Sequence, residues 1–241
     1  MPNEHVSKKE LEKERTPSEL WDWLIQKVNQ ICSTEEGRRT FRLQNDKEKH
    51  VKKLVEEVTP LAIYGKQKYG DTDQVFLQPV IGPQNYDAKV IDKRTEPASV
   101  TYIEITQAHE GEDNYWRRCE LLEKGIVFSN APVIKTGKGK NRSVSIPPEA
   151  TSVEERVKNE LNRILDAAKR KAGKDYPPNT SLIIFFDDTP PFEEALKVIN
   201  HTTIDSFVKK EIMNLGLRFS QFYLVGEAKE VFREYPIKRE G

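Results

Sequence analysis

Two acidic side chains in predicted strands are the residues of this sequence best suited to chemistry. Asp87 lies in the segment 86–93 and Glu104 in the segment 99–107, where most neighbours are apolar or β-branched. An acid in a strand that buries one face is costly unless something pairs with it, and two acids on adjacent strands repel each other. A divalent cation such as Mg²⁺ would relieve both penalties, because hard cations bind carboxylate oxygens. The alternative is that both acids are solvated on an open face of the sheet.

The elements that must position these acids are a helix and a group of strands. The helix begins near Lys47, and Pro60 ends or kinks it. Three predicted strands follow, close enough in sequence to form an antiparallel meander, at 74–81, 86–93 and 99–107.

Helices and strands alternate after this meander. A short helix at 112–124 precedes hairpin-like residues at 126–146, and Thr151 opens a long amphipathic helix. The continuous apolar run at 181–186 is typical of a strand buried on both faces. Two further helical stretches and a last hairpin are expected at 192–200, 204–215 and 221–235.

This order, with Asp87 on the second strand and Glu-x-Thr at 104–106 on the third, resembles the PD-(D/E)XK nuclease fold, also called restriction-endonuclease-like. The resemblance covers residues 47–186. It implies an α/β fold with a mixed sheet of five or six strands flanked by helices. It also implies a site in which Asp87 and Glu104 hold Mg²⁺ or Mn²⁺ and phosphodiester bonds are hydrolysed.

The sequence departs from the family pattern at Thr106, where a lysine usually stands. Thr106 would position water or phosphate but carries no charge, so Lys89, on the same face as Asp87, would stabilise developing charge. Arg117 or Arg118 on the next helix could also supply the missing positive charge, although the simpler interpretation of each is a surface charge. Many family members also use a glutamate of the first helix in the site, and Glu56 or Glu57 would be that residue here. We favour the alternative, in which both glutamates are solvated beside the apolar stripe of the helix.

The clearest basic segment is 131–147, which contains no acid. Its cations are Lys135, Lys138, Lys140 and Arg142. Glycines at 137 and 139 would let the tip approach a phosphate backbone, which favours contact with DNA or RNA. A solvated hairpin tip of ordinary composition is the alternative.

Composition restricts the remaining choices. Lys plus Arg and Asp plus Glu are both 39 in 241 residues, so net charge does not direct the protein to nucleic acid or membrane. The two cysteines and four histidines have no metal-ligand spacing, and no run is long enough to cross a membrane. The charged N-terminus is not a secretory signal, and we expect a cytoplasmic protein.

We therefore expect a disordered arm at 1–15 and one α/β domain at 16–241. The domain would consist of a helical extension (16–46), a nuclease-like core (47–186) and C-terminal helices with a hairpin (187–241). The function indicated is a metal-dependent nuclease-like protein that acts on or binds nucleic acid, with catalysis weak or lost. The competing hypothesis is a non-enzymatic protein-interaction module on the same scaffold.

Overall fold

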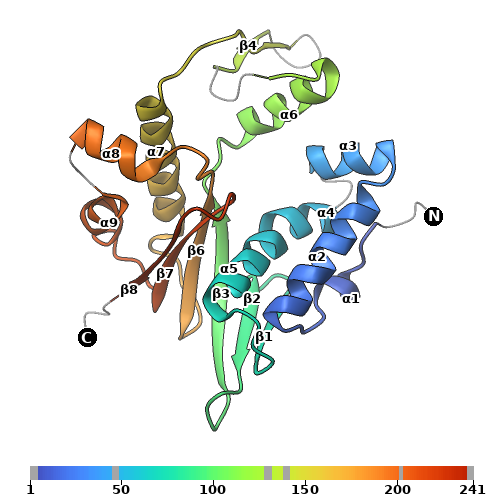
Figure 1. The fold of residues 1–241 in the computed structure, drawn as a ribbon, viewed down its shortest axis with the longest axis vertical. Coiled ribbons are helices and arrows are strands. Elements are labelled where there is room, and N and C mark those ends of the chain that lie inside the picture. The colour runs from blue at the N-terminus through green and yellow to red at the C-terminus, as the bar shows by residue number, and fades with distance from the viewer. Residues whose placement is uncertain (1–4, 45–48, 128–131, 138–141, 201–202, 238–241) are drawn as a thin grey trace.

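A computed structural model describes residues 5–44, 49–127, 132–137, 142–200 and 203–237, and it is an α/β structure built on a mixed six-stranded sheet (Figure 1). The strand order is β1-β2-β3-β6-β7-β8. β3, β6 and β7 are parallel to one another, and the outer pairs are antiparallel. The strands of this sheet are β1 (Val75–Pro79), β2 (Ala88–Asp92), β3 (Ser99–Gln107), β6 (Thr180–Phe186), β7 (Gln221–Gly226) and β8 (Phe232–Pro236). The expected α/β class with a mixed sheet is confirmed.

Helices cover both faces of the sheet. Those before the sheet are α1 (Lys8–Leu11), α2 (Pro17–Ile31), α3 (Glu35–Leu43), α4 (Lys49–Lys53), the π-helical turn η2 (Leu54–Val58) and α5 (Thr59–Tyr69). Those between the parallel strands are α6 (Glu112–Lys124), α7 (Val153–Lys171), α8 (Phe192–Asn200), α9 (Ile204–Phe207) and the π-helical turn η4 (Val208–Ile212). No helix within the described ranges is both long enough and apolar enough to cross a membrane.

Two hydrophobic cores lie on opposite faces of the sheet. The first packs α2, η2 and α5 against β1, β2 and β3 and continues under β6 and β7. The second packs α7, α8 and α9 against β6, β7 and β8, and among its described members it has no residue of β1, β2 or β3. α7 and α5 therefore lie on either side of the sheet, with β3 between them (Figure 1).

The helix before the sheet continues through Pro60 by widening into a π turn. Pro60 has no N–H, so a carbonyl one turn earlier loses its usual donor. The carbonyls of Val55 and Glu56 instead accept weak hydrogen bonds from Gln107 Nε2, each at 3.4 Å. This contact ties η2 to the end of β3, the strand that carries Glu104.

The expectation of a disordered arm at 1–15 is wrong for the part of it that the structure describes. Residues 5–15 pack on the domain: Val6 and Leu11 are fully buried in the first core, and Ser7 and Glu10 form a capping box for α1. Arg15 then pairs with Leu77 at the edge of β1. Lysines and glutamates dominate this segment, but the burial of Val6 and Leu11 and the pairing of Arg15 with Leu77 hold it on the domain.

Candidate functional site

Asp87 and Glu104 meet where β2 begins. Ala88 pairs with Ile103, and the Asp87 N–H donates to the Ile103 carbonyl at 2.7 Å, so the antiparallel register brings Asp87 opposite Glu104. The side chain of Asp87 bends toward β3, and its Oδ2 accepts a hydrogen bond from the Ile105 N–H at 2.8 Å. Glu104 is buried. The two acids singled out in the sequence are thus on neighbouring strands and close to each other.

A third acid, Glu57, joins them from the π turn η2. Its side chain is only 12% exposed, which corrects the expectation that it is solvated. Glu57 Oε1 pairs with Lys53, one helical turn earlier. Glu57 Oε2 is buried and accepts no hydrogen bond from a described donor. The Glu57 carboxyl lies within hydrogen-bonding reach of Asp87, and this contact lowers the pKa of Asp87. We call Glu57, Asp87 and Glu104 the acid cluster.

Two lysines contact the acid cluster from opposite helical layers. Lys53 of α4 pairs with Glu57, and Lys171, the last residue of α7, pairs with Glu104 at 2.5 Å. Both lysines also lower the pKa of Asp87 through their charge. The cluster therefore combines three carboxylates with two ammonium groups between the helical layers.

The pKa values of all three acids are raised, first of all by burial. The pKa of Glu57 is raised to about 7, because burial and then the charge of Asp87 together outweigh the contact with Lys53. Burial also raises the pKa of Asp87, although the hydrogen bond from the Ile105 N–H lowers it. Burial and then the charge of Asp87 raise the pKa of Glu104, and the contact with Lys171 opposes this rise.

Tyr176, in the loop after α7, faces the same acids. Its hydroxyl is buried without a hydrogen-bond partner among the described residues. Burial and then the charges of Glu104 and Asp87 raise the pKa of Tyr176, so the phenol stays protonated at neutral pH. A neutral hydroxyl donor thus stands near the acid cluster.

The acid cluster suits a divalent cation in its chemistry. Its donors are carboxylate oxygens, the ligands that Mg²⁺ and Mn²⁺ prefer, and Glu57 Oε2 is a buried acceptor that a cation would satisfy. The described side chains, as they stand, contain no group of three or more His, Cys, Asp or Glu that is ready to hold a metal ion. Metal binding would therefore require the carboxylates to exchange contacts with Lys53 and Lys171.

Thr106 and Lys89 differ in their relation to the cluster. Thr106 lines a cavity of about 850 Å³ together with Glu57, between η2 and α7. Lys89 lies on β2 opposite Tyr102, with its Nζ 6.0 Å from the ring centre of Tyr86. The ammonium in contact with Glu104 is that of Lys171, which the sequence reading did not consider.

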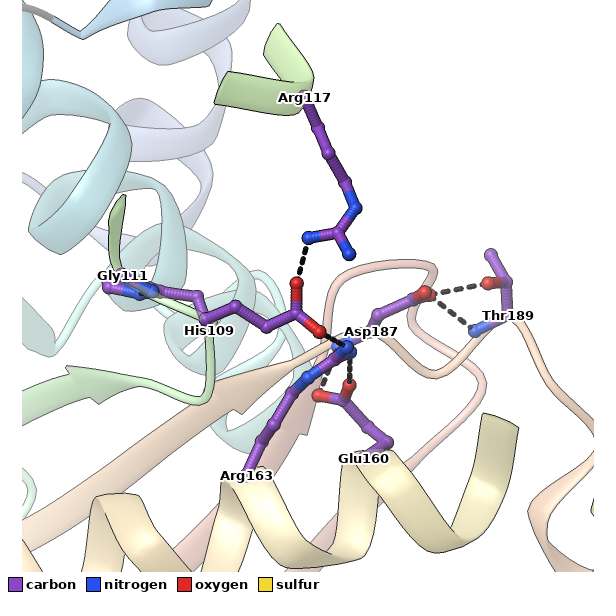
Figure 2. Close-up of polar contacts among 8 residues, drawn as sticks. His109, Gly111, Arg117, Glu160, Arg163, Asp187 and Thr189 are labelled. Carbon is purple, nitrogen blue, oxygen red and sulfur yellow. Dashed lines mark hydrogen bonds and ion pairs between the residues drawn. The ribbon is translucent and has the colours of Figure 1, made fainter. Parts of the chain in front are cut away.

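The arginines of α6 lie away from the acid cluster. Arg117 is buried and pairs with Glu110, and Figure 2 shows it in a network with α7. There Arg163 contacts both Glu110 and Glu160, and Glu160 Oε1 accepts from the Asp187 N–H at 3.3 Å. Arg118 lines two smaller cavities of about 400 and 430 Å³ beside this network. We call Glu110, Arg117, Glu160 and Arg163 the arginine network.

The basic hairpin is present, but its described cations face acids. Its strands, β4 (Ile134–Thr136) and β5 (Ser143–Ser145), are antiparallel. Lys135 pairs with Glu112 and Asp113 of α6, and Arg142 also pairs with Glu112. Lys138 and Lys140 lie outside the described residues. Acids outside the hairpin thus offset part of the charge that made this segment stand out.

Comparison with known proteins adds no relative. No protein-family model matches this chain, and neither the curated proteins nor the solved structures contain a match. The geometry of the acid cluster is therefore the basis for any functional conclusion.

Proposed function

We propose that this protein is a Mg²⁺- or Mn²⁺-dependent phosphodiester hydrolase of restriction-endonuclease-like type that acts on nucleic acid. The observation that carries the proposal is the acid cluster, and in particular the buried Glu57 Oε2, which has no donor among the described residues and stands beside Asp87. Asp87, Glu104 and Glu57 would hold the cation.

The element order supports this proposal. A helix bearing Glu57, a three-stranded meander bearing Asp87 and Glu104, and a helix that crosses to a buried parallel strand occur in the order expected from the family resemblance. Fold resemblance alone does not imply activity, so the weight rests on the cluster.

A bound divalent cation would polarise the phosphate and activate water. The remaining chemistry falls to this chain's own groups. Lys171, already beside Glu104, would stabilise charge at the phosphate, the role that the family pattern gives to a lysine two residues after the second acid. Lys89 is the weaker candidate because it lies over Tyr86. Thr106 would position water or phosphate, and the protonated Tyr176 would donate a hydrogen bond.

One observation favours the non-enzymatic alternative. Lys53 and Lys171 each neutralise a carboxylate of the cluster. A buried set of charges can be retained as a structural network, and in that case the sheet would serve only as a scaffold for a binding surface.

Metal binding separates the two functions. We expect isothermal titration with Mn²⁺ and Mg²⁺ to give a saturable heat with the wild type and none with Glu57→Gln or Glu104→Gln. Asp166→Asn is the matched control, because Asp166 lines the same cavity but is 66% exposed. With supercoiled, duplex and single-stranded substrates, Lys171→Met should slow cleavage by about 10²–10³-fold. Lys169→Met, on the exposed side of the same helix, should not.

Two results would contradict this function. Equal metal heats in the wild type and both glutamine variants would remove the cluster as the binding site. A wild type that is inert on every substrate with either metal would leave the scaffold alternative.

A further inference from the structure

One face of the β1-β2-β3 half of the sheet is not covered by either hydrophobic core. The strand register aligns two rows of side chains on it: Phe76, Ile91 and Val100 in one, and Gln78, Lys89 and Tyr102 in the other. Each β2 side chain in these rows stands between its two partners. We call these six residues, with the neighbouring Tyr86, the open sheet face.

The opposite face of the same strands shows the contrast. Val75, Leu77, Ala88, Val90 and Ile103 are at most 2% exposed and belong to the first core. The apolar residues of the open sheet face are in neither core, nor among the partly buried residues packed against them. Val100 is 40% exposed, and the other six are partly exposed.

Aromatic rings and lysines dominate this face. The rings of Tyr86 and Tyr102 lie 4.7 Å apart, and Lys89 lies beside Tyr86. Phe76 carries the ammonium of Lys93 at 4.0 Å from its ring centre. Cross-strand aromatic pairs also stabilise sheets, but these rings are partly exposed and belong to neither core. Accessible rings next to cations are a surface on which bases stack and phosphates pair.

The charges beside the open sheet face suit an anionic strand. Neither Lys89 nor Lys174 forms an ion pair with a described residue, and Lys93 contacts Glu14 only at 3.7 Å. Lys174, in the loop after α7, is exposed, and the next residue of that loop, Asp175, accepts a hydrogen bond through its carbonyl from Asn85, the residue before Tyr86. Asp175 is the nearest exposed acid of that loop, and it pairs with Arg218.

The open sheet face continues into the acid cluster. Side chains alternate along a strand, so the row after Gln78, Lys89 and Tyr102 on the same face contains Asp87 and Glu104. A chain lying along the rows would reach Asp87 and Glu104 of the acid cluster without leaving this side of the sheet.

We propose that the open sheet face binds unpaired nucleotides of a single-stranded nucleic acid, with bases on Tyr86 and Tyr102 and phosphates at Lys89 and Lys174, and leads the strand to the acid cluster. This proposal rests on the proposed function for what happens at the cluster, but binding itself requires no metal. Paired bases of a duplex are not free to stack on these rings, so a single strand is the occupant that fits.

The test is fluorescence anisotropy in EDTA with a labelled oligonucleotide, as single-stranded DNA, as single-stranded RNA and as a duplex of the same sequence. We expect single strands to bind more tightly than the duplex. Tyr102→Leu and Tyr86→Leu, which keep apolar bulk, should each weaken binding about tenfold. Lys89→Gln should reduce the salt slope by about 0.7, as expected for one lost phosphate contact on a single strand.

Two controls match these variants. Tyr115→Leu removes a tyrosine of α6 that is 40% exposed, and Lys169→Gln removes a cation from the outer surface of α7 that is 55% exposed. Neither should change affinity. The unfolding midpoint of each variant shows whether that variant is folded. If Tyr102→Leu does not fold, Tyr86→Leu still tests whether the tyrosines bind bases.

Three outcomes would overturn the proposal. The first is duplex binding as tight as single-strand binding. The second is single-strand affinity that the tyrosine and lysine variants leave unchanged. The third is a protein that binds no nucleotide but forms a dimer by light scattering, with the dimer dissociated by Tyr102→Leu. If the protein binds single strands but gives no heat of metal binding, the open sheet face remains a binding surface and the hydrolase proposal fails. If the protein binds metal and cleaves nucleic acid but the variants of the open sheet face have no effect, the hydrolase proposal stands and the binding surface fails.

Discussion

The acid cluster and the arginine network both bury glutamates, but they satisfy them differently. In the arginine network, both oxygens of Glu110 accept from arginines, and those of Glu160 accept from Arg163 and from the Asp187 N–H (Figure 2). In the acid cluster, Glu57 Oε2 has no donor among the described residues and its neighbour Asp87 is a like charge. The glutamates of the arginine network are neutralised by arginines of two helices, whereas we propose that the acid cluster takes up a cation from outside.

Acidity alone does not distinguish these two regions. The pKa values of Glu57 and Glu160 are both raised to about 7, and burial is the largest cause in each. The second cause differs: the charge of Asp87 raises the pKa of Glu57 further, whereas the contact with Arg163 lowers that of Glu160. Both glutamates pair with a cation, so what distinguishes them is the sign of the largest contribution to the pKa after burial.

The largest expected effect is on stability, from Arg163→Met. This change leaves Glu110 and the 3% exposed Glu160 without their shared cation, so we expect a loss of about 3 kcal/mol in the free energy of unfolding at pH 8. Denaturant unfolding measures it. Lys169→Met, which removes an exposed 3.8 Å pair with Asp166, should cost less than about 0.5 kcal/mol. Equal losses in the two variants would mean that the arginine network is not structural.

The second effect is a gain of stability from Glu57→Gln. Because the pKa of Glu57 rises from 4.5 to about 7 on folding, the folded state holds this proton more tightly than the unfolded state. The contribution of Glu57 is therefore best below pH 4.5 and is lost as pH rises through about 7. We expect Glu57→Gln to be more stable than the wild type by about 2 kcal/mol at pH 8 and by much less at pH 5.

Unfolding curves at the two pH values check this prediction. Glu160 should impose a similar loss with rising pH, so the wild-type slope should be only partly removed by Glu57→Gln. An unchanged slope in Glu57→Gln would mean that Asp87 does not destabilise the Glu57 carboxylate.

Local patterns in the sequence predicted the scaffold well. Alternating apolar residues located β2 and β3, and with them Asp87 and Glu104, while the apolar run at 181–186 located the buried strand. Thr16, Pro17 and Glu19 form the expected capping box and helix start of α2. These features depend on neighbours in sequence, so one chain suffices to read them.

The rest of the site depends on contacts between distant segments. Lys169, Arg170 and Lys171 look equivalent at the end of α7, and only the crossing of α7 over β3 brings Lys171 to Glu104. The sequence predicts a solvated Glu57 because a regular helical period takes no account of the π turn that carries it. Lys53, four residues before Glu57, is the one local signal that could have indicated a paired acid.

The smallest expected effect, and the one that compares the two regions most directly, is stabilisation by Mg²⁺. A cation bound only by the folded state at ten times its dissociation constant adds about 1.4 kcal/mol, which raises the melting temperature of a chain this long by about 3–6 °C. We expect this rise at pH 8 in the wild type and in Glu160→Gln, because Glu160 is held by Arg163, and none in Glu57→Gln. Thermal melts with NaCl at matched ionic strength remove general screening. If Mg²⁺ raised the melting temperature of Glu57→Gln as much as that of the wild type, the cation would bind elsewhere. If the rise were lost only in Glu160→Gln, the arginine network, not the acid cluster, would be the metal-binding region.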